Sequence, residues 1–117
     1  MSSKITKFED IIAWQKARKL SKNIYKLFTG NKDYSFCNQI NRASVSISNN
    51  IAEGFERKSN KELKAFLYIA KGSCGEVRSM IYLALDLRYI SERNFKIIYN
   101  QTIEVSKLIA GFIKSLK

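Results

Sequence analysis

Apolar side chains recur every three or four residues in four separate segments of this chain. The last segment is the most regular, with steps of 3, 4, 3, 4, 3 and 4 residues. Its members are Phe95, Ile98, Thr102, Val105, Ile109, Phe112 and Leu116. This spacing lines side chains along one face of an α-helix and forms a seam of the coiled-coil kind. The chain also lacks proline, the residue that breaks helices most strongly, so the sequence predicts an all-α fold.

The four segments predict helices at about residues 10–29, 35–57, 60–88 and 92–116. Asp10 is expected to cap the first helix, and Gly30 to follow its end. Ser59 and Glu62 form a capping box before the third helix, and Ser91 is expected to cap the fourth. Because the connections are only a few residues long, neighbouring helices must run antiparallel. We therefore expect residues 1–117 to form a single domain, an up-down-up-down antiparallel four-helix bundle.

Several features that the sequence lacks exclude whole classes of protein. Its longest apolar run is six residues, Met80 to Leu85, whereas a membrane span needs about 20. The N-terminus has no signal-peptide core, so we expect a cytoplasmic protein without membrane association. There is no histidine, and Cys37 and Cys74 are isolated, so no metal site is expected. Because the carboxylates are scattered, we expect no catalytic residue, no cofactor and no enzymatic activity.

The formal charge is +11, from 21 basic and 10 acidic residues. Such an excess attracts polyanions, nucleic acid among them, although a lysine-rich proteome would give the same composition. Two groups form the candidate nucleic-acid-binding surface: Lys16, Arg18, Lys19, Lys22 and Lys26 in the first helix, and Lys64, Lys71 and Arg78 in the third. Lys96, Lys107 and Lys114 form a further row in the fourth. Tyr68 and Tyr82 lie near the second group, and such a surface contacts phosphates and stacks on bases. A merely solvated helix face is the alternative.

The stretch SISNNIAEGFER, residues 46–57, interrupts the apolar pattern of the second helix with polar side chains. It contains no nucleophile with a partner base, so a catalytic site is disfavoured. We expect a structural polar network that fixes helix register and partner choice. Its members are Arg42, Ser46, Asn49, Asn50 and Glu53. Gly54 follows and would allow a neighbouring helix to approach closely.

Several apolar residues fall outside the predicted seams. They are Val45 and Ala52 in the second helix, and Ile97, Ile103, Leu108 and Ile113 in the fourth. A second apolar face on a small bundle indicates self-association, although scattered exposed apolar residues are also common. We therefore expect a homo-oligomer, and the spacing itself does not set the number of subunits.

Three stretches of the chain resemble a known bacterial family. They are FEDIIAWQKARKLSKNIYKL (8–27), QINRASVSISNNIAEGFERKSNKELKAFLYIAKGS (39–73) and LDLRYI (85–90). The resemblance is to the four-helix-bundle proteins encoded in intervening sequences of ribosomal RNA genes. That family is similar to the accessory variability determinant of diversity-generating retroelements. Asn41 and Ser48 depart from its pattern, at positions where a basic residue and proline are usual.

The resemblance implies a four-helix bundle that assembles into a homopentamer and has no enzymatic activity. It implies binding to structured RNA or DNA, in agreement with the basic faces. It also implies an alternative, a protein-interaction adaptor for a nucleic-acid-handling partner such as a reverse transcriptase. We expect the first function, a non-enzymatic and oligomeric basic scaffold that associates with nucleic acid.

Overall fold

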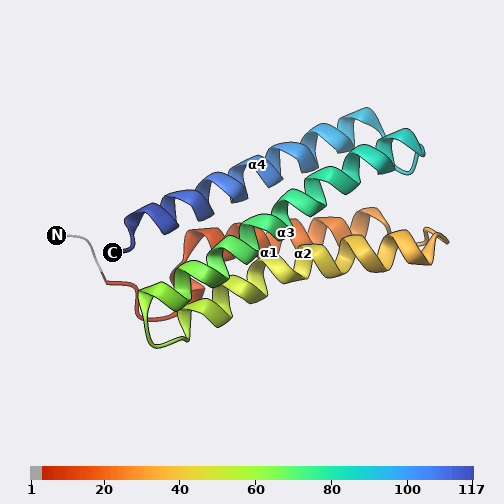
Figure 1. Cartoon of the computed structure of the whole chain (residues 1–117). Helices are drawn as coiled ribbons and strands as arrows, with labels where there is room; N and C mark the ends of the chain where they lie inside the picture. The colour runs from red at the N-terminus through yellow and green to blue at the C-terminus, as the bar shows by residue number, and fades with distance from the viewer. Residues whose placement is uncertain (1–3) are drawn as a thin grey trace.

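Four α-helices account for most of residues 4–117, which are the residues that the computed structural model describes (Figure 1). A short 3₁₀ turn, η1 (Phe8–Asp10), precedes them. The helices are α1 (Ile12–Leu27), α2 (Tyr34–Phe55), α3 (Asn60–Asp86) and α4 (Glu92–Ser115). Each begins and ends within about two residues of the boundary expected from the sequence, which is the usual precision of such boundaries. The predicted all-α class is confirmed.

The helices form an antiparallel bundle that is 47 Å long and 23 by 19 Å across. Each helix packs against the next in the chain, and α4 also packs against α1. Within the described residues, α1 and α3 make no such contact, so they occupy diagonal corners. Figure 1 shows the C-terminus of α4 at the same end of the bundle as the start of α1. This is the predicted up-down-up-down bundle.

The core is a column of aliphatic side chains to which every helix contributes. Leu20, Ile47, Ile81 and Ile109, one from each helix, have no exposed surface. Thr102 is also fully buried; its hydroxyl donates a hydrogen bond to the carbonyl of Tyr99, one turn earlier, at 2.6 Å. Burying an aliphatic side chain of this size stabilises a fold by about 1.5–3 kcal/mol. The three- and four-residue spacing is therefore what holds the bundle together.

Two of the predicted helix caps are confirmed. The Ser59 hydroxyl accepts a hydrogen bond from the backbone N–H of Glu62 at 3.2 Å, and the same hydroxyl donates to the Glu62 carboxylate. The Ser91 hydroxyl accepts from the backbone N–H of Asn94 at 3.1 Å. Gly30 follows α1 with φ of +85°, a conformation in which glycine has no steric penalty.

The prediction that Asp10 caps the first helix is wrong. Asp10 ends η1, and Ile11 takes the cap position without a side-chain hydrogen bond. Ile11 is 3% exposed, so burial of its side chain decides where the chain turns into the helix. The Gln15 side chain joins the first turn of α1 to η1, because its amide donates a hydrogen bond to the carbonyl of Glu9 at 2.8 Å.

Asp33 caps α2, a role that the sequence analysis did not assign. Its carboxylate accepts a hydrogen bond from the backbone N–H of Phe36 at 3.1 Å. It also accepts one from the Tyr89 hydroxyl at 2.7 Å, which ties the α1–α2 connection to the α3–α4 connection. The bonds from Tyr89 and from the Phe36 N–H lower the pKa of Asp33, while the bond to Asp33 raises the pKa of Tyr89.

Candidate functional site

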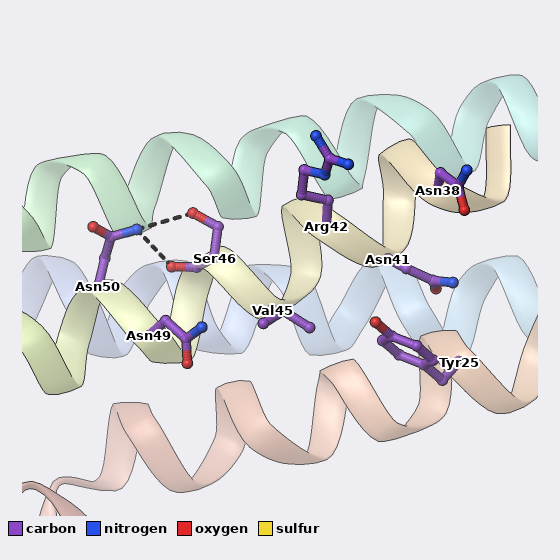
Figure 2. A pocket seen from close by; sticks show the side chains of 8 residues that line it. All are labelled: Tyr25, Asn38, Asn41, Arg42, Val45, Ser46, Asn49 and Asn50. Carbon is purple, nitrogen blue, oxygen red and sulfur yellow. Dashed lines mark hydrogen bonds between the residues drawn. The ribbon is translucent and has the colours of Figure 1, made fainter. Parts of the chain in front are cut away.

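A polar contact joins α2 and α3 in the middle of the bundle. The Ser46 and Ser73 hydroxyls share a hydrogen bond of 2.9 Å. The Asn50 amide nitrogen donates to the Ser46 hydroxyl at 2.9 Å and to the Ser46 carbonyl at 2.8 Å. Figure 2 shows both bonds. The orientation of the Asn50 amide is thereby fixed, with its nitrogen engaged by Ser46.

The expected network of five side chains is divided by the structure into separate parts. Glu53 forms an ion pair with Arg57 at 2.8 Å and does not join Asn49 or Arg42. The guanidinium of Arg57 also lies 4.8 Å from the centre of the Phe66 ring. Arg42, Asn49 and Glu53 are exposed, whereas Ser46 and Asn50 are half-buried. Glu53 therefore lies outside the hydrogen-bonded part of the expected network, because its carboxylate pairs with Arg57 one turn ahead.

The basic side chains of α1 form a ridge. This helix contains Lys16, Arg18, Lys19, Lys22 and Lys26 and no acidic residue. All are exposed except Lys16, which is half-buried and lies 3.7 Å from Glu104 of α4. The Arg18 guanidinium lies 5.7 Å from the centre of the Trp14 ring, a cation–π contact. We call Arg18, Lys19, Lys22 and Lys26 the α1 ridge.

The basic row of α3 borders the side of that helix that packs on α4. Lys71 and Arg78 lie three residues before and four residues after Cys74, so they flank it on one helix face. The Cys74 thiol donates to the carbonyl of Thr102 on α4 at 3.2 Å. Lys64 precedes Lys71 by seven residues, or about 10 Å along the helix. Tyr68 and Tyr82 are 61% and 50% exposed, and Tyr82 packs edge-on against Phe95 of α4 at 5.0 Å.

The two basic groups therefore border α4 from opposite sides. Lys96, Lys107 and Lys114 of α4 are exposed and lie on its outward side. In α2 the charged residues are Arg42 and Glu53 alone, so this helix carries no net formal charge. The excess positive charge of the helices lies mainly in α1, which has five basic and no acidic residues. It is smaller in α4, with four basic and two acidic residues, and smallest in α3, with four basic and three acidic residues.

A shallow groove of about 640 Å³ lies over the outer side of α2 and extends to Tyr25 of α1. Its lining residues in α2 are Asn38, Asn41, Arg42, Val45, Ser46, Asn49 and Asn50, and α1 contributes Tyr25. Figure 2 shows Tyr25 reaching from α1 toward α2 beside Asn41. In the same view Val45 and Asn49 point toward α1, whereas Arg42 and Asn50 point toward α3. We call the part lined by Tyr25, Asn38, Asn41, Val45 and Asn49 the amide groove.

One polar atom at this groove has no partner. The side-chain oxygen of Asn41 is buried and makes no hydrogen bond within the described residues. A buried polar atom without a partner costs about 1–3 kcal/mol. The Tyr25 ring, in contrast, is 49% exposed, so the groove combines an open aromatic face with an unsatisfied amide.

Tyr25 and Asn38 were not among the site residues predicted from the sequence. Tyr25 lies in a helix whose exposed pattern is mostly basic, and Asn38 has the sequence context of an ordinary exposed polar residue. Only the packing of α1 on α2 brings them together. That packing is fixed locally by the Ser21 hydroxyl, which donates to the carbonyl of Ser44 at 2.9 Å.

The two thiols are buried. Burial raises the pKa of Cys74 to about 11 and, less strongly, also raises the pKa of Cys37. Among residues 4–117, no group of three or more His, Cys, Asp or Glu side chains is arranged to hold a metal ion. Over the same residues, no helix has the length and apolarity needed to cross a membrane.

Comparisons with known proteins agree on the fold. The family model described as 23S rRNA-intervening sequence protein matches residues 9–111. A similar solved structure is that of a protein with unknown function from the S23 ribosomal protein family of Bacteroides thetaiotaomicron VPI-5482. It is 26% identical, with a TM-score of 0.83, and the match covers 89% of this chain and 100% of that one. A search of the curated proteins found no match.

Proposed function

The chain belongs to the 23S rRNA-intervening sequence protein family, and from this premise we propose that it is a non-enzymatic, oligomeric basic scaffold that associates with nucleic acid. The supporting observation is the distribution of charge. The α1 ridge, the α4 lysines and the α3 row surround three sides of the bundle, whereas the charges within α2 cancel. A surface of this kind recognises the phosphate backbone by charge, without reading sequence.

A salt titration tests this function. The purified protein is titrated at low salt with a structured RNA, a single strand and a duplex, and the measurement is repeated as salt rises. For a duplex, the logarithm of the affinity should fall against the logarithm of salt concentration with a slope of about −0.9 per phosphate neutralised. Absence of binding to all three probes at low salt would refute the proposal.

A matched pair of variants locates the surface. Replacing Lys19, Lys22 and Lys26 of the α1 ridge by alanine removes three exposed cations, and the salt slope should become shallower by about three. Replacing Lys4, Lys32 and Lys58, which are exposed and lie outside all four helices, removes the same charge. Equal losses of affinity in both variants would mean that total charge acts, and not the ridge.

The oligomeric part of the proposal rests on residues left outside the core. Ile97 of α4 is 46% exposed, whereas Val45 is half-buried and does not extend an apolar face. Leu108 and Ile113, expected on a second apolar face, instead pack against the core as partly buried residues. The homopentamer comes from the family resemblance and stays a prediction. Measurement of mass in solution tests it, and a monomer at micromolar concentration would contradict it.

The second candidate function is an adaptor for a nucleic-acid-handling protein such as a reverse transcriptase. It is favoured by the resemblance to the retroelement determinant, and it would use the same basic surface to dock an acidic partner. Gene neighbourhood separates the two functions, since an adjacent reverse transcriptase gene would favour the adaptor. The absence of enzymatic activity and the cytoplasmic location stay predictions as well.

A further inference from the structure

We propose that the amide groove on the outer side of α2 is a subsite for unpaired nucleobases, which gives the protein a base preference that its lysines alone would not provide. This inference rests on the proposed function, because the groove would receive bases only from a nucleic acid held by the α1 ridge. It assigns a role to residues on the neutral side of the bundle.

The position of Tyr25 connects the groove to the basic surface. Arg18, Lys22 and Tyr25 are four and three residues apart, so they share one face of α1. Arg18 and Lys22 are exposed, and the Tyr25 ring reaches toward α2 (Figure 2). A strand whose phosphates follow Arg18 and Lys22 therefore places its bases beside the Tyr25 ring. Stacking on an exposed aromatic ring suits any base and needs an unpaired one.

The amides supply the chemistry that distinguishes bases. Asn38, Asn41 and Asn49 line the groove, and an asparagine amide carries both donors and an acceptor that match a base edge. The buried oxygen of Asn41 has no partner within the described residues. Rotation of that side chain toward a bound base would satisfy this atom, so base binding relieves a cost present in the free protein.

The chemistry of the groove favours a base over a protein helix. Val45 is the one aliphatic residue among those that line it, so a helix docked here would bury little apolar surface. Helix-in-groove recognition depends on several apolar anchors. The lining also contains no carboxylate, so nothing in it repels phosphate.

The test uses fluorescent single-stranded oligo(A), oligo(C), oligo(G) and oligo(U) RNAs of about twelve nucleotides, a length within the usual range of single-strand sites. The wild-type protein should bind the four with different affinities. Tyr25→Ala should weaken binding about tenfold, whereas Tyr25→Phe keeps the ring and should bind like the wild type. Asn41→Ala and Asn49→Ala should reduce the differences among the four RNAs and leave the salt slope unchanged.

Asn100→Ala is the matched control, because Asn100 is an exposed asparagine of α4 outside the groove. Melting curves of the variants separate lost binding from unfolding, and Asn41→Ala should melt no lower than the wild type since it removes an unsatisfied atom. The inference is overturned if the RNAs bind and the groove variants keep wild-type affinity and preference. A change of oligomeric mass in these variants would assign the groove to a second copy of the chain and overturn it equally. If no RNA binds, the proposed function fails first.

Discussion

Replacement of glycine by alanine should lower the free energy of unfolding at one position of this bundle and raise it at two others. Gly54 lies in α2 where that helix contacts α3, and Gly72 and Gly75 lie within α3. A Cβ atom added at Gly54 would lie 2.6 Å from the Cβ of Phe66 and 3.1 Å from Cδ1 of Leu63. A Cβ added at Gly72 or Gly75 would meet nothing within 4 Å.

The magnitudes follow from these distances. Carbon atoms pack at about 3.5–4.0 Å, so Gly54→Ala would force α2 and α3 apart by about 1 Å, because the Cβ of Phe66 is held by its own backbone. Overpacking of this kind costs about 1–3 kcal/mol. Alanine recovers about 0.4–1 kcal/mol by restricting the unfolded chain, so Gly54→Ala should lower the free energy of unfolding by roughly 1–2 kcal/mol.

At Gly72 and Gly75 only the favourable contribution operates. Each alanine should raise the free energy of unfolding by about 0.4–1 kcal/mol. This gain is common to both variants, so the gap between the Gly54 and Gly72 variants equals the overpacking cost of about 1–3 kcal/mol. For a domain of about 100 residues, 1 kcal/mol shifts the melting temperature by roughly 4 °C, so the two variants should melt roughly 4–12 °C apart.

Urea unfolding followed by far-ultraviolet circular dichroism measures these differences, with the mass of each sample checked so that assembly is constant. Gly72→Ala serves as the internal control for helix propensity, because it changes the same atoms in a neighbouring helix. If Gly54→Ala proved as stable as Gly72→Ala, the close approach of α2 and α3 at this position would be wrong. Gly54 would then not be required for the packing of α2 on α3.

Three further predictions follow from single contacts. The hydrogen bonds that lower the pKa of Asp33 stabilise the fold above the unfolded pKa of about 4, and this stabilisation is lost as pH falls through the lower folded pKa. On acidification, the melting temperature of Asp33→Asn should therefore fall less than that of the wild type. Equal falls in the two melting temperatures would count against the Tyr89 hydrogen bond. The raised pKa of Cys74, about 11, should leave its thiol unreactive toward a disulfide reagent at neutral pH until urea unfolds the protein; rapid labelling of native Cys74 would contradict its burial. Asn50→Leu should keep its helical content but alter the assembly or broaden the melting transition, because Ser46 loses its amide donor. An unchanged mass and melting curve would argue against a role of Asn50 in fixing helix register and partner choice.

Much of the fold was accessible from the sequence because helix formation is governed by near neighbours. The capping box of Ser59 and Glu62 was found because its members are three residues apart. The partner of Glu53 was also within reach, since Arg57 lies four residues ahead and i,i+4 pairs of opposite charge attract. The prediction of an Asp10 cap is wrong for a different reason, because the cap position is taken by Ile11, whose side chain is buried in the core.

The candidate sites also contain some features that the sequence predicts and others that depend on the packing of the helices. The basic residues of α1 and α3 could be recognised from composition and spacing, but their position on either side of α4 could not. The amide groove is made by Tyr25 of α1 and by side chains of α2, and no short-range pattern relates the two helices. The Asp33–Tyr89 hydrogen bond likewise joins residues 56 apart in the chain.

The sequence by itself determined the class of the fold, the four helices and the main apolar seam of the fourth helix. Those properties follow from a periodic arrangement of apolar side chains, and the period of the α-helix converts it directly into a buried face. The tertiary structure alone decided which polar groups meet, because each such contact depends on the rotation and offset of one packed helix against another. The pairing of Ser46 with Ser73, the unsatisfied oxygen of Asn41 and the neutral groove beside the α1 ridge all arise from that packing.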